Sequence, residues 1–190
     1  MKKVGILGGT YNPPHIGHLM IANEVKHALD LDEVRLMPTA MPPHKDADNQ
    51  VTKEQRLEMV RLAVGETCGL TVSSYEIDRG GISYTFDTMK CLTEKEPDTK
   101  FYFIIGGDMI DQLDTWHRIE ELLDLMTFVG VNRPGWQSET DYPVQLVSIP
   151  EIDLSSTLLR ERFQTGGPVT FLVPQSVEAF IRREGLYGAD

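Results

Sequence analysis

The sequence contains few cysteines and no long apolar run. Cys68 and Cys91 are the two cysteines among 190 residues, and they do not stand at metal-ligand spacing. Such usage is typical of a reducing compartment, so we expect a cytoplasmic protein without disulfides. No apolar stretch approaches the length that crosses a bilayer and no signal-peptide pattern begins the chain, so we expect no membrane partner.

Positive charge is also scarce. The chain has 18 Lys and Arg against 29 Asp and Glu, which gives a formal net charge of −11. Binding of duplex DNA or tRNA needs basic surface to offset phosphate repulsion, so we expect no nucleic acid partner. Nucleotide-sized anions remain open, because one helix end and a few local cations are enough to hold them.

The composition is otherwise that of a globular protein, with 41% hydrophobic and 25% charged residues. A length of 190 residues predicts one domain over 1–190, and no internal repeat divides it. The sequence does not decide between a monomer and a homodimer.

Short apolar runs alternate with segments of helical spacing. The runs, expected as strands, are 4–7, 34–37, 70–72, 101–105, 128–131 and 144–149, and the expected helices are 16–29, a segment after 52, a segment after 85, 119–125, 155–163 and 175–184. This alternation predicts an α/β fold, a Rossmann-like doubly wound parallel sheet with helices on both faces. Ligands of such folds bind beyond the carboxyl ends of the strands, so we expect the C-terminal helices to close a nucleotide site there.

The turn after the first strand carries the sequence GGTYNPPHIGH at 8–18. A strand, a glycine turn and a helix start together present backbone N–H groups to a phosphate. The glycine spacing is not the GxGxxG of dinucleotide sites, and the Gly-Lys-Ser/Thr ending of a Walker A loop is missing. The turn therefore predicts an anion site of another kind.

Two histidines three residues apart mark the start of the following helix. His15 and His18 are expected on one helical face, where both imidazoles can contact the same anion. Gly17 between them carries no Cβ that would hold the anion away. Asn12 before the prolines is expected to cap the helix.

A second anion site is expected at Ser155-Ser156-Thr157-Leu158-Leu159-Arg160. Serine and threonine favour helix N-caps, and by itself the segment is an ordinary helix start. Ser156 and Arg160 are four residues apart and share a face, where the guanidinium offers a fork suited to phosphate.

The two motifs together resemble those of the HxGH nucleotidyltransferase superfamily, and nearly the whole chain resembles the bacterial nicotinate-nucleotide adenylyltransferase family. The residues that carry this likeness are GGTYNPPHIGH at 8–18, PPHK at 42–45, SYTFDT at 83–88, GGD at 106–108, WHR at 116–118 and SSTLLR at 155–160. The resemblance implies transfer of AMP from ATP to nicotinate mononucleotide, with Mg²⁺, giving nicotinate adenine dinucleotide and pyrophosphate in NAD biosynthesis.

The resemblance also implies the site residues. His15, His18 and Arg160 would be catalytic, and the residues implied to bind ATP are Gly8, Gly9, Thr10, His15, His18, Gly106, Asp108, Ser156, Thr157 and Arg160. Those implied for nicotinate mononucleotide are Lys45, Thr85, Trp116, His117 and Arg133. We expect no protein ligand for the Mg²⁺, which prefers phosphates and water because it loses water slowly.

The chemistry independently fits a site without a general base. The second pKa of a phosphate monoester is near 6, so the mononucleotide is largely a dianion at pH 7 and is already a nucleophile. The protein then has to position the reactants and neutralise charge. No catalytic triad or carboxylate pair is expected.

Three alternatives stay open at this stage. Another nucleotidyltransferase would use nicotinamide mononucleotide, phosphopantetheine or a cytidylyl donor, and kinetics on the acid and amide mononucleotides would separate it. A nucleotide-sensing module would bind without releasing pyrophosphate. A synthetase fragment is disfavoured by the length, the acidity and the lack of a lysine-rich KMSKS loop. Where the family often has a tyrosine after the tryptophan, this chain has His117.

Overall fold

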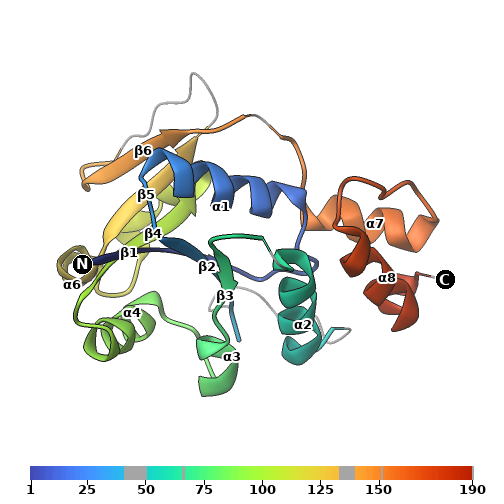
Figure 1. Cartoon of the computed structure of the whole chain (residues 1–190), viewed down its shortest axis with the longest axis horizontal. Coiled ribbons are helices and arrows are strands. Elements are labelled where there is room, and N and C mark those ends of the chain that lie inside the picture. Colours follow the sequence, from blue (N-terminus) through green and yellow to red (C-terminus); the bar gives the residue numbers. More distant parts are fainter. Residues whose placement is uncertain (41–50, 66, 133–139, 151, 190) are drawn as a thin grey trace.

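The computed structural model describes residues 1–40, 51–65, 67–132, 140–150 and 152–189. Within them six parallel strands form one sheet in the order β3-β2-β1-β4-β5-β6 (Figure 1). The strands are β1 (Lys2–Gly9), β2 (Glu33–Pro38), β3 (Leu70–Val72), β4 (Thr99–Gly106), β5 (Thr127–Asn132) and β6 (Val144–Ser148). The order reverses between β1 and β4, which is where a doubly wound sheet opens a crevice for a ligand.

The helices complete the α/β alternation. They are α1 (Ile16–Ala28), α2 (Lys53–Val64), α3 (Tyr75–Arg79), α4 (Thr85–Lys95), α5 (Gly107–Ile110), α6 (Ile119–Leu125), α7 (Ser156–Thr165) and α8 (Gln175–Arg183), with 3-10 turns η1 (Leu113–Thr115) and η2 (Leu186–Gly188). In Figure 1, α1 lies on one side of the sheet and α4 on the other. The pair α7 and α8, orange to red, lies at the end of the molecule opposite α6. The fold class is the one that the alternation predicts.

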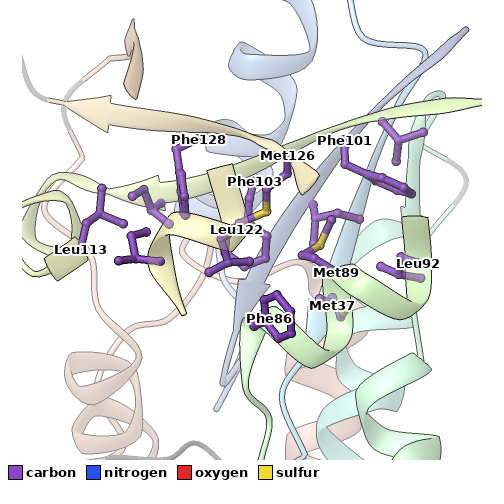
Figure 2. Packing of buried hydrophobic residues seen from close by; sticks show 14 of the residues in the cluster. Met37, Phe86, Met89, Leu92, Phe101, Phe103, Leu113, Leu122, Met126 and Phe128 are labelled. Atoms are coloured by element: carbon purple, nitrogen blue, oxygen red, sulfur yellow. The ribbon is translucent and has the colours of Figure 1, made fainter. Parts of the chain in front are cut away.

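Alternating side chains of β4 fill both faces of the sheet. Phe101, Phe103 and Ile105 point into a cluster with α4 and α6, and Figure 2 shows the first two of them among its aromatic rings and methionines. Tyr102 and Ile104 point into the opposite cluster, which also takes residues from α1 and α2. A strand buried on both faces is apolar throughout, which explains the uninterrupted run seen in the sequence.

A third apolar cluster joins the C-terminal helices to α2. Met59 and Ala63 of α2 pack with Leu159 of α7 and with Phe180 and Ile181 of α8. Because α2 also packs on the sheet, this cluster fixes α7 against the carboxyl ends of the strands.

The sequence predicts the long elements and misses the short ones. All six expected strands are present, and α2 begins where Thr52 suggests, since its side chain accepts the N–H of Gln55 at 3.1 Å. The helices α3 and α5 and the two 3-10 turns were not predicted, because three to five residues are too few for a periodic pattern.

Candidate active site

The turn after β1 is held by side chains that point back into the protein. Tyr11 is buried, with φ 51°, and its hydroxyl donates to the Leu7 carbonyl oxygen at 2.5 Å. The expectation that Asn12 caps the helix is wrong, because α1 begins at Ile16 and His15 is its N-cap. The Asn12 Oδ1 instead accepts the Tyr187 hydroxyl at 2.5 Å, so the tail of the chain fixes the turn.

The two motif histidines lie against each other. The rings of His15 and His18 are stacked, with centroids 3.7 Å apart and planes at 29°. The backbone N–H of His15 donates to Nδ1 of His18 at 3.1 Å. With Nδ1 as an acceptor, the neutral His18 ring carries its proton on Nε2, which is the nitrogen that can donate to a ligand.

Gly17 makes room for an imidazole. A Cβ at this position would come within 3.0 Å of Nδ1 and 3.1 Å of Cε1 of His15. The sequence suggested that this glycine leaves space for an anion, and the contact that the structure gives is with the histidine ring itself.

Burial keeps both imidazoles uncharged. It lowers the pKa of His15 to about 4, and burial followed by the neighbouring His15 lowers the pKa of His18 well below its ordinary value. His15 is 6% exposed, and its Nδ1 has no hydrogen-bond partner among the described residues. At neutral pH the pair therefore offers N–H donors and acceptors in place of two positive charges.

The start of α7 contacts the same turn. The Ser155 hydroxyl caps α7 by accepting the N–H of Leu158 at 3.2 Å. The Ser156 hydroxyl donates to the Pro13 carbonyl at 2.9 Å. Nη1 of Arg160 donates to the Asn12 carbonyl at 2.8 Å, and Nη2 donates to Oγ1 of Thr157 at 3.2 Å. The structure thus brings together two motifs that are about 140 residues apart in the sequence.

Five further residues expected to bind ATP lie at or just after the carboxyl ends of β1 and β4, where the order of the sheet reverses. Gly8 and Gly9 end β1, Gly106 ends β4, and β1 pairs directly with β4. Thr10 follows β1, and Asp108 is the second residue of the short α5. A Cβ at Gly8 would approach the Phe103 ring to 3.3 Å, so this glycine also serves the packing of the sheet.

Part of the mononucleotide set comes together at the start of α4. Thr85 is its first residue, and the Tyr84 ring lies 5.1 Å from the ring of His117. Trp116 is half-buried, with its ring roughly perpendicular to Phe103 and Phe128.

Two further candidates, Lys45 and Arg133, lie outside the described residues. The structure therefore relates three of the five mononucleotide candidates to the fold, namely Thr85, Trp116 and His117.

Three residues that the sequence did not single out anchor the turn. Tyr11 and Tyr187 hold it as described, and the Arg56 guanidinium of α2 donates to the Thr10 carbonyl at 2.8 Å. Tyr11 lies within the motif at 8–18 without a readable role there, and Arg56 and Tyr187 belong to no short motif, since a hydrogen bond to a distant residue leaves no local pattern in the chain.

No three His, Cys, Asp or Glu side chains in the described part of the chain lie close enough to form a metal site. No helix in it is both long and apolar enough to span a membrane.

Comparison with protein families matches residues 6–162 to the cytidylyltransferase-like family. A protein of Bacillus cereus strain Q1, named "Probable nicotinate-nucleotide adenylyltransferase", is 52% identical over 187 residues, which is 98% of this chain and 99% of that protein. A protein of the same name from Bacillus cytotoxicus is 51% identical over 187 residues, which again is 98% of this chain and 99% of that protein. The likeness thus extends over both motifs and the C-terminal helices.

Solved structures share the fold at much lower identity. The nicotinic acid mononucleotide adenylyltransferase of Plasmodium falciparum, in complex with NaAD, has a TM-score of 0.81 at 18% identity and covers 100% of this chain and 99% of its own. A structure described as a putative nicotinate-nucleotide adenylyltransferase of Vibrio parahaemolyticus has a TM-score of 0.72 at 21% identity, with 98% and 96% covered. Similarity at this level extends to the arrangement of strands and helices.

The buried histidines make stability depend on pH. Unfolded His15 titrates near 6.5 and folded His15 near 4, so the unfolded state binds more protons in that window. The free energy of unfolding should therefore fall as the pH is lowered from 7 to 5, with about 2 kcal/mol of the loss due to His15. Urea denaturation at both pH values measures it.

The substitution His15→Asn, which keeps a good N-cap, should reduce this pH dependence. The exposed His27 of the same helix is the matched control, and His27→Asn should leave the dependence unchanged. An identical slope in wild type and His15→Asn would contradict the burial argument.

Proposed function

This chain belongs to the cytidylyltransferase-like family and to its nicotinate-nucleotide adenylyltransferases, and on that premise we propose how its residues carry the reaction. The enzyme transfers AMP from ATP to nicotinate mononucleotide and forms nicotinate adenine dinucleotide and pyrophosphate in NAD biosynthesis. Residues 10–18, which lead from β1 into the first turn of α1, end in His15-Ile16-Gly17-His18 and are called the HIGH turn below. The observation that carries the proposed roles is the contact of the HIGH turn with the start of α7, where Ser156 donates to the Pro13 carbonyl and Arg160 to the Asn12 carbonyl.

The transfer needs no base from the protein. An oxygen of the mononucleotide phosphate, largely a dianion at pH 7, attacks the α-phosphorus of ATP in line. The new P–O bond forms as the bond to the β-phosphate oxygen breaks, and pyrophosphate leaves with that electron pair. The residues have to hold two polyanions together and stabilise the charge that develops, as preorganised donors do.

We assign His15 and His18 to the phosphates of ATP. Neutral imidazoles fit this role, because a fixed N–H donor stabilises developing charge without having to be desolvated as a cation. In His18, Nδ1 is occupied by the backbone N–H of His15, which leaves Nε2–H as the donor. Arg160 donates from Nη1 to the Asn12 carbonyl and from Nη2 to Oγ1 of Thr157, and we assign its other N–H groups to the departing pyrophosphate.

The other proposed ATP contacts surround this pair. We assign the Gly8 and Gly9 backbone and Thr10 to the path of the triphosphate, Ser156 and Thr157 to its pyrophosphate end, and Gly106 with Asp108 to the ribose. Gly8, Gly9 and Gly106 end β1 and β4 at the reversal of the sheet, and Thr10 and Asp108 follow these strands, which supports the assignment.

For the mononucleotide we propose a site at the start of α4. The backbone N–H groups of the first turn of α4 have no acceptor within the helix, and together with the Thr85 hydroxyl they suit the carboxylate of the pyridine ring. Trp116 suits stacking on the ring itself. His117 lies against Tyr84 at the same helix end, which supports a place for it beside Thr85. Lys45 and Arg133 are proposed for the phosphate on the family likeness alone.

We propose that Mg²⁺ enters the site bound to the phosphates of ATP. The described donors near the turn are imidazoles, hydroxyls and guanidinium groups, so phosphate oxygens and water would hold the ion while these residues hold the phosphates. A bound Mg²⁺ neutralises part of the triphosphate charge. We further propose that residues 1–190 act as one nucleotidyltransferase domain in the cytoplasm, and size measurement of the purified protein would separate monomer from homodimer.

Replacing His18 tests the donor role. We expect His18→Ala to lower kcat at least about 100-fold with the fold retained, because a donor to developing charge is lost. Pyrophosphate release at saturating substrates measures kcat, and circular dichroism measures the fold. His27→Ala, in the last turn of α1, is the control and should keep the wild-type kcat. A folded His18→Ala with unchanged kcat would remove this residue from the mechanism.

Replacing Arg160 tests the leaving-group role. We expect Arg160→Ala to raise the KM for ATP about tenfold, and the KM for the mononucleotide by much less, because it loses a charged donor to the pyrophosphate end. Arg162→Ala, on the same helix, is the control, since the Arg162 Nη1 donates to the Pro168 carbonyl. Equal changes in both KM values would contradict the assignment.

Replacing Thr85 tests selectivity for the acid. We expect Thr85→Val to reduce the ratio of kcat/KM for nicotinate mononucleotide over nicotinamide mononucleotide about tenfold, because a hydrogen bond to a carboxylate is lost. Thr93→Val, further along α4, is the control, since the Thr93 hydroxyl donates within the helix to Met89 and Lys90 carbonyls. An unchanged ratio would place carboxylate recognition elsewhere.

A further inference from the structure

Arg56 is a buried cation that the proposed reaction does not use. It lies in the second turn of α2 and is 6% exposed. Its Nη1 donates to the Thr10 carbonyl at 2.8 Å, and its Nη2 donates to the Ala40 carbonyl at 3.0 Å. Thr10 directly follows β1, which ends at Gly9, and Ala40 lies two residues after the end of the neighbouring strand β2 at Pro38.

The charge of Arg56 has no paired carboxylate in the described ranges of the chain. Its two hydrogen-bond acceptors are neutral carbonyls, and burial lowers the pKa of its guanidinium from the ordinary value. Glu54 attracts it from the preceding turn without forming an ion pair. Burying a cation without a counter-ion costs free energy, so the fold retains Arg56 at the expense of stability.

The two carbonyls belong to the two halves of the proposed site. Thr10 opens the turn that runs to His15 and His18. Ala40 follows β2 and contacts the chain that leads to Thr85, where the mononucleotide site is proposed. One guanidinium therefore joins the chain that leaves β1 toward His15 and His18 to the chain that leaves β2.

A second contact extends this link to α4. The backbone N–H of Ala40 donates to the Ser83 hydroxyl oxygen at 3.2 Å, two residues before Thr85. The backbone of Ala40 is thus held at its carbonyl by Arg56 of α2 and at its N–H by Ser83, which precedes α4.

We propose that Arg56 is a positioning residue, which holds the ATP turn and the mononucleotide half of the site at the separation that in-line attack needs. The proposal rests on the function proposed above. A planar guanidinium can donate to two carbonyls in fixed directions, whereas a lysine ammonium at the end of a flexible chain cannot reproduce that fork. Because in-line transfer depends on reactant separation, a displacement of about 1 Å between the halves can cost about 100-fold in rate.

The test measures kcat apart from the binding of each substrate. For Arg56→Gln we expect kcat to fall about 30-fold or more, while the Kd for ATP alone and for nicotinate mononucleotide alone each change less than about threefold. Arg56→Lys keeps the charge and loses the bridge, so its kcat should stay within about threefold of that of Arg56→Gln. Arg61→Gln, an exposed arginine of the same helix paired with Glu58, should behave as wild type.

The outcomes separate cleanly. A folded Arg56→Gln with wild-type kcat, recovery of kcat by lysine, or a loss confined to one Kd would each overturn the proposal. If Arg56→Gln does not fold, Ser83→Ala replaces it, since it frees the Ala40 N–H without removing a charge and should lower kcat about threefold or more at unchanged Kd values. Wild type without pyrophosphate release would instead refute the proposed function, independently of Arg56.

Discussion

Hydrogen bonds to the backbone carbonyls of one turn connect the parts of this molecule. The carbonyls of Thr10, Asn12 and Pro13 each accept a donor from a distant side chain, namely Arg56 of α2, Arg160 of α7 and Ser156 of α7. Carbonyls that a turn directs toward the protein are removed from water and need donors there. The tertiary structure supplies these donors from α2 and α7.

The uncharged state of the histidine pair follows from the same packing. Two imidazolium rings 3.7 Å apart would repel each other, and burial already favours the neutral forms. The neutral His18 ring is then oriented by a hydrogen bond, because the His15 N–H donates to its Nδ1. In a chain with a net charge of −11, the roles proposed for this turn rest on local N–H donors and on individual guanidinium groups.

The long elements of the fold could be predicted because their causes are local. The strands of the sheet are apolar runs or alternate apolar residues, and Thr52 with Gln55 forms a capping box that any similar helix would use. The short helices α3 and α5 could not be predicted, since packing against neighbouring strands stabilises them more than their own five and four residues do. The prediction that Asn12 caps α1 was wrong for a similar reason, because its side chain binds Tyr187, which lies 175 residues away in the sequence.

By itself the sequence determined the strand and helix order, the two anion motifs and the family likeness, because spacing along the chain carries that information. The tertiary structure decided that the HIGH turn and the SSTLLR helix meet, that the imidazoles are stacked and neutral, and that Arg56 joins the ends of two strands. These features depend on burial and on contacts between residues far apart in the chain. Both arise when the helices close on the sheet, so no local pattern of residues records them.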